Sequence, residues 1–77
     1  PAAGVERSSR REHDALQAAR AELEAAREAK YREIRDTELD YRTGKLSRDD
    51  YQAIDADLRA EALTILDRLE RLSSTDA

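Results

Sequence analysis

The chain of 77 residues contains no cysteine, methionine, tryptophan or phenylalanine, and only two glycines and one proline. Without cysteine, the chain can form neither a disulfide framework nor a thiolate metal site, and it has no thiol nucleophile. The scarcity of glycine and proline means that few positions interrupt a helix. No run of apolar residues approaches the roughly 18 that a membrane-spanning helix needs, so the sequence itself contains no membrane span.

Charged residues make up 42% of the sequence, with a net charge of -4, and the apolar residues are mostly Ala and Leu. This composition is typical of long helices and coiled coils. Acidic and basic residues are interleaved and form no basic stripe, so we expect no nucleic-acid partner. Because so short a chain buries only a modest part of its surface, a self-sufficient core is not expected.

One stretch in the middle of the chain predicts a helix end, a tight turn and a second helix start. Gly44 follows a long run of helix-forming residues and can adopt the left-handed conformation that commonly ends a helix. Ser47 and Asp50 have the spacing of a capping box, in which each side chain binds the backbone N–H of the other. Leu46 and Tyr51 flank this box at the spacing of a hydrophobic staple. The chain is therefore expected to reverse here.

A second capping box, formed by Ser9 and Glu12, predicts that the first helix begins at Arg10. Arg10–Thr43 contains neither glycine nor proline, and the four residues after Leu72 are polar. These boundaries give a flexible lead over 1–8, a helix over 10–43, a turn over 44–47, a helix over 48–72 and a disordered tail over 73–77.

Apolar residues recur along both predicted helices at helical spacing. On the first helix they are Leu16, Ala19, Leu23, Ala26, Tyr31, Ile34 and Tyr41. On the second they are Tyr51, Leu58, Ile65 and Leu72, with Ile54, Ala62 and Leu69 between them. The fold class is predicted to be all-α: an antiparallel, coiled-coil-like two-helix hairpin that dimerises to a four-helix bundle. Tyr51 is then expected near Leu39 or Tyr41, and Ile65 near Ala26 and Arg27.

Leucines outnumber the positions that one facing helix can cover, because Leu63 and Leu66 lie off the facing stripe. The extra apolar surface predicts association with a second copy, or with another membrane-associated protein. The residues predicted to form this interaction surface are Leu16, Leu23, Leu63, Leu66, Leu69 and Leu72.

No residue grouping predicts catalysis, so we expect neither an enzyme nor a cofactor. His13 lacks the Glu three residues before it that helical di-iron sites use. The turn around Gly44 is similar to the second half of an EF-hand loop, but Leu39, Tyr41 and Thr43 occupy the leading ligand positions. Calcium needs six to eight oxygen ligands, so a metal site is not predicted. The alternative hypothesis is a small ligand- or metal-responsive hairpin that uses the turn.

The stretch Tyr31–Tyr41, followed by Gly44-Lys45-Leu46-Ser47, Asp50-Tyr51 and Leu58, resembles the helical hairpin of CcmI-type c-type cytochrome biogenesis proteins. Hairpins of the SHOCT type and of gas-vesicle accessory proteins have a similar pattern. The CcmI resemblance implies a cytoplasmic interaction segment that follows a membrane anchor, while apocytochrome binding belongs to other parts of those proteins. The cluster Arg7, Arg10 and Arg11 agrees with a preceding anchor, because basic residues gather on the cytoplasmic side.

Overall fold

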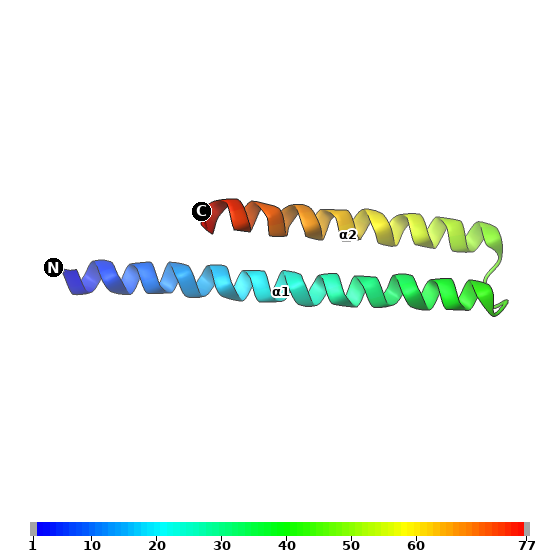
Figure 1. Cartoon of the computed structure of the whole chain (residues 1–77), viewed down its shortest axis with the longest axis horizontal. Helices are drawn as coiled ribbons and strands as arrows, with labels where there is room; N and C mark the ends of the chain where they lie inside the picture. Colours follow the sequence, from blue (N-terminus) through cyan, green and yellow to red (C-terminus); the bar gives the residue numbers. More distant parts are fainter. Residues whose placement is uncertain (1, 77) are drawn as a thin grey trace.

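The computed structural model describes residues 2–76 and the side chains of residues 8–74. Two helices, α1 (Ala2–Arg42) and α2 (Arg48–Asp76), run antiparallel and lie side by side (Figure 1). The molecule measures 65 × 16 × 13 Å, and no strand occurs among the described residues. The predicted all-α antiparallel hairpin is confirmed.

The end of α1 is closed by two backbone hydrogen bonds in the turn. The N–H of Lys45 donates to the carbonyl oxygen of Asp40 at 2.8 Å, and the N–H of Gly44 donates to that of Tyr41 at 3.1 Å. This pair of bonds is a Schellman motif, which requires a left-handed residue at the position of Gly44. Gly44 has φ of +82°, as the motif demands. The predicted role of Gly44 is confirmed, and α1 ends one residue before the predicted Thr43.

The start of α2 is capped by Ser47. The N–H of Asp50 donates to Ser47 Oγ at 3.1 Å, and the N–H of Tyr51 donates to the Ser47 carbonyl oxygen at 2.9 Å. The predicted helix start at Arg48 is confirmed. Both residues are described by the structure, but the reciprocal hydrogen bond, from the Ser47 N–H to the Asp50 carboxylate, is not formed. A capping box prefers Glu or Gln at this position, and the Asp side chain is shorter by one methylene.

The outer ends of both helices correct the predicted boundaries. Ser9 does not cap α1, because the helix already runs from Ala2 through the predicted lead. A capping residue permits a helix start without requiring one, and a single Gly4 costs only about 1 kcal/mol relative to Ala. The predicted disordered tail is helical as far as Asp76, since no glycine or proline follows Leu72 to stop α2. The parts of these predictions that concern residues 1 and 77 lie outside the described residues.

Three contacts fix how the two helices face each other. The rings of Tyr41 and Tyr51 are stacked, with centroids 4.5 Å apart and planes 4° from parallel. Further from the turn, Lys30 Nζ lies 2.6 Å from Glu61 Oε2. Ile65 and Ala26 line the same hollow. The paired residue numbers add up to nearly the same value each time, so one register holds along the hairpin. The predicted proximity of Tyr51 to Tyr41 and of Ile65 to Ala26 is confirmed.

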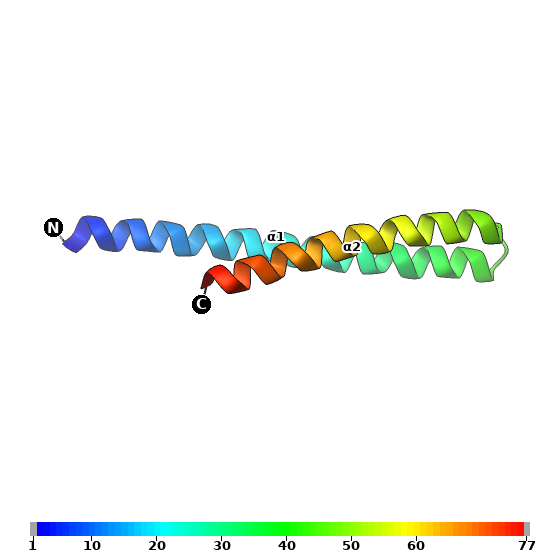
Figure 2. The same cartoon turned by 90° about the horizontal axis from the view of Figure 1, so that it is seen from above.

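The facing sides of the two helices form what we call the seam. Its positions alternate by four and three residues, as in a coiled coil, and Figure 2 shows α2 crossing α1 at a shallow angle. Apart from Tyr41, all seam residues are half-buried or, for Ala62, buried. The seam comprises Leu16, Arg20, Leu23, Arg27, Lys30, Ile34, Thr37 and Tyr41 of α1, and Tyr51, Asp55, Leu58, Ala62, Ile65, Leu69 and Leu72 of α2.

Four apolar residues predicted for the facing stripe have no seam position: Ala19, Ala26, Tyr31 and Ile54. Ala19 and Ala26 directly precede the seam residues Arg20 and Arg27, which are half-buried. Ile54 is 38% exposed, and its neighbour Asp55 is half-buried in its place. Tyr31 is 39% exposed, and its neighbour Lys30 is half-buried. In each case the alternation of four and three residues determines the seam position, because it fixes which side of the helix faces the partner helix.

Helix α1 extends well past the end of α2 (Figure 1). With Tyr41 opposite Tyr51, the end of α2 at Asp76 falls near Leu16, so residues 2–15 have no helix beside them. At the α-helical rise, this overhang is roughly 20 Å long. In the described part of the chain, neither helix has the combination of length and apolarity that crossing a membrane requires.

Candidate interaction surface

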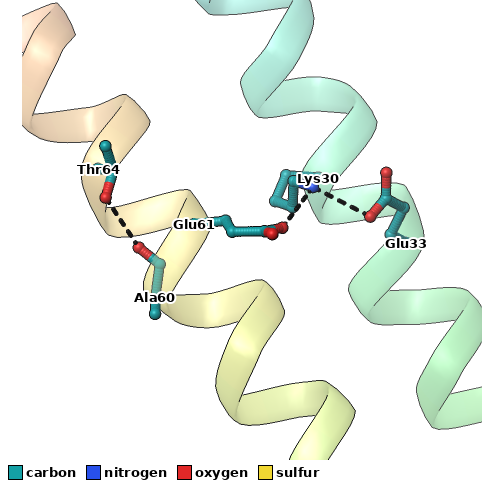
Figure 3. A network of polar contacts seen from close by, with 5 residues as sticks. All are labelled: Lys30, Glu33, Ala60, Glu61 and Thr64. Atoms are coloured by element: carbon teal, nitrogen blue, oxygen red, sulfur yellow. Dashed lines mark hydrogen bonds and ion pairs between the residues drawn. The ribbon is translucent and has the colours of Figure 1, made fainter.

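Lys30 forms the polar link between the two helices. Its Nζ lies 2.6 Å from Glu61 Oε2 on α2 and 3.1 Å from Glu33 Oε2 on α1 (Figure 3). The hydrogen bond to Glu61 raises the pKa of Lys30 above its ordinary value, and the hydrogen bond to Glu33 adds to this shift. The Lys30 side chain is 18% exposed, whereas that of Glu61 is 57% exposed. The aliphatic stem of Lys30 therefore covers the seam while its ammonium group reaches the edge.

Charged and polar residues occupy an unexpected share of the seam. Arg20, Arg27, Lys30 and Thr37 all have seam positions on α1 and are half-buried. Apolar periodicity alone could not find them, because these residues are polar. The signal that could have found them is spacing, since steps of four and three residues counted back from Tyr41 reach each one.

Asp55 is a second polar group in the seam. Its Oδ2 accepts a hydrogen bond from Arg59 Nε at 2.9 Å, while its Oδ1 is buried without a hydrogen-bond partner. A buried polar atom that lacks a partner lowers stability. Thr37 of α1 lies opposite Asp55 in the register described above. Between Thr37 and Asp55 the seam therefore buries little apolar surface.

The predicted interaction leucines separate into two groups. Leu16, Leu23, Leu69 and Leu72 are half-buried and have seam positions, so the hairpin itself partly covers them. Leu63 is 67% exposed and lies off the seam. Leu66 is half-buried and also lies off the seam. Of these six leucines, only Leu63 and Leu66 have no position in the seam.

Leu63 and Leu66 border a shallow hollow between the helices. Its volume is about 310 Å³. Tyr31, which is 39% exposed, lies at the same hollow on the α1 side. The residues that line it are Tyr31, Ile34, Arg59, Ala62, Leu63 and Leu66. We call this the Leu63 groove, and it combines projecting leucines with a concavity beside them.

The residues that the sequence singled out at the turn have structural roles, whereas those predicted to cap the start of α1 do not. Gly44 and Ser47 make the Schellman motif and the N-cap, and Leu46 is half-buried beside them. Glu12 and Ser9 are exposed within α1. Among the described residues, no three His, Cys, Asp or Glu side chains are grouped closely enough to hold a metal ion.

Comparisons with protein-family models, with curated proteins and with solved structures find no match to this chain.

Proposed function

We propose that this hairpin is a non-enzymatic module that associates with a second copy of itself, and that the Leu63 groove is the contact surface. The observation that carries the proposal is the exposure of Leu63, at 67%, on a chain in which Ala62 is the only buried residue among those described. Apolar side chains gathered at a hollow are typical of protein interaction surfaces. A second hairpin would supply the cover that one hairpin lacks.

The incomplete burial of the seam favours association with a partner. In a single hairpin most seam residues are only half-buried, and three of them are basic: Arg20, Arg27 and Lys30. Burying a fully exposed leucine contributes about 1.5–3 kcal/mol, so covering Leu63, which is 67% exposed, and the uncovered part of Leu66 in both copies adds a few kcal/mol. Association therefore stabilises both the hairpin and the dimer.

Replacing Leu63 with Asp tests the proposal. In a symmetric dimer the change removes two buried leucines and introduces two carboxylates, so we expect the dissociation constant to rise about 100-fold or more. Sedimentation equilibrium over a range of chain concentrations measures this constant. Leu39→Asp is the matched control, because Leu39 is also exposed, at 58%, but lies outside the Leu63 groove.

The expected result is that Leu63→Asp weakens association and Leu39→Asp does not. Equal weakening of association by both variants would mean that the contact surface is not the Leu63 groove. An unmodified chain that sediments as a well-folded monomer at tens of micromolar would refute self-association itself. Helix content measured by circular dichroism on the same samples distinguishes loss of association from loss of folding.

We further propose that the module functions in the cytoplasm, as the segment after a membrane anchor in a protein of the CcmI type. The support is the resemblance of Tyr31–Leu58 to that hairpin and the basic cluster at Arg7, Arg10 and Arg11. Reading the gene product upstream of Pro1 tests this. We expect an apolar stretch of roughly 20 residues there, and a polar upstream sequence would contradict the proposal.

A further inference from the structure

Four side chains beside the Leu63 groove have a symmetric order along α2. Arg59, Leu63, Leu66 and Glu70 follow one another at steps of four, three and four residues, which places them along one side of the helix. The order is basic, apolar, apolar, acidic. If it is read in the opposite direction, each charge meets its opposite and each leucine meets a leucine.

We infer that the second copy packs its α2 antiparallel on the α2 of the first. Arg59 then lies opposite Glu70 of the second copy, and Leu63 lies opposite Leu66 of the second copy. The two-fold axis passes between Thr64 and Ile65. This inference rests on the proposed self-association and adds the element, the direction and the register of the contact.

Charge favours this direction over the parallel one. In a parallel, in-register dimer Arg59 would face Arg59 and Glu70 would face Glu70, so like charges would flank the leucines at both ends. The antiparallel arrangement replaces both repulsive contacts with two opposite-charge pairs. Such complementarity fixes register and suppresses the wrong arrangement. It also forms a closed two-fold contact, which uses the same patch on both copies.

Arg59 can take part in this contact while it keeps its contact within the hairpin. Its bond to Asp55 uses Nε alone, at 2.9 Å, and its side chain is 63% exposed. A guanidinium carries five N–H donors, so one side chain can bind two carboxylates. At the next positions outward, Ala56 lies opposite Ser73 of the second copy. Both residues are small and exposed, so the helices can stay close at the ends of the contact.

Disulfide trapping tests the direction directly, because the natural chain has no cysteine. Ala56→Cys and Ser73→Cys variants are prepared separately, mixed, and equilibrated in a glutathione redox buffer. The antiparallel register brings residue 56 of one copy to residue 73 of the other, so the disulfide that joins the two different variants should dominate. Disulfides between two copies of the same variant would indicate a parallel dimer and overturn the inference.

A charge-reversal series supplies a second, independent measurement. Glu70→Arg should weaken association about tenfold, since two favourable exposed pairs become two repulsive ones. The double variant R59E/E70R restores opposite charges across an antiparallel contact, so it should recover most of that loss. It would recover nothing in a parallel, in-register dimer. Circular dichroism verifies that each variant stays helical, because Arg59→Glu also places a second carboxylate beside Asp55.

The two proposals fail in different ways. A dimer in sedimentation that forms no disulfide between the two different variants overturns the antiparallel register and leaves self-association standing. A monomer in sedimentation overturns both. A dimer that is trapped as the mixed disulfide, and whose affinity recovers in the double variant, supports both.

Discussion

Replacing Gly44 with Ala should destabilise the hairpin by about 1 kcal/mol. Gly44 has φ of +82°, and an L-residue in the left-handed region costs roughly 1–2 kcal/mol. A Cβ built at Gly44 meets no heavy atom within 4 Å, so no steric term adds to that cost. Alanine also restricts the unfolded chain, which returns about 0.4–1 kcal/mol. The difference leaves a net loss near 1 kcal/mol, which lowers the midpoint of thermal unfolding by about 4–8 °C.

Thermal unfolding followed by circular dichroism measures this loss, at one fixed chain concentration because a dimer gains stability as concentration rises. Gly4→Ala is the control, since the second glycine lies within α1, where alanine is the better helix former. It should leave the midpoint unchanged or raise it slightly. Gly44→Asn should cost less than Gly44→Ala, because Asn tolerates the left-handed region better. A loss above about 3 kcal/mol for Gly44→Ala would require a clash that the structure lacks. A gain in stability from Gly44→Ala like that from Gly4→Ala would refute the Schellman turn.

Two further substitutions test the cap and the polar link. Ser47→Ala removes the acceptor of the Asp50 N–H and should cost about 1 kcal/mol in thermal unfolding, whereas Ser9→Ala should cost little because Ser9 lies inside α1; equal losses would mean that Ser9 is a cap. The pKa of Lys30 is raised above 10.5 by Glu61 and Glu33, so its ion pairs stabilise the hairpin fully below that ordinary value and are lost as pH rises through the folded-state pKa. The stability difference between the natural chain and Lys30→Met should therefore shrink above about pH 10.5, and a difference that stays constant to pH 12 would contradict the link.

The turn was predictable from the sequence because its signals are local. Gly44 supplies the left-handed conformation and Ser47 supplies the cap, and neither depends on what the rest of the chain does. The outer helix ends were not predictable in this way. At Ser9 the chain can either begin a helix or continue one that began earlier, and the free energies of these two arrangements differ by only about 1 kcal/mol.

Which residues form the seam depends on how each helix is rotated about its own axis. Apolar residues alone do not define this rotation, which we call the phase, when they are sparse. Ile54 and Asp55 are adjacent, and only the step of four residues from Tyr51 selects the aspartate. The same phase keeps Leu69 in the seam and leaves Leu63 and Leu66 outside it, as the sequence predicted. The location of the surplus leucines was therefore predictable, whereas the polar seam positions of Arg20, Lys30 and Asp55 required the structure.

The uncovered length of α1 has a consequence for anything joined to the chain ahead of Ala2. In the proposed antiparallel pair, the two overhangs point in opposite directions from a central two-fold axis. At a rise of 1.5 Å per residue, the two N-terminal ends stand roughly 75 Å apart. The pair would then be a rigid spacer that keeps two attached bodies at a set separation. Inserting whole helical turns into the overhang would lengthen that separation without disturbing the contact between the two α2 helices.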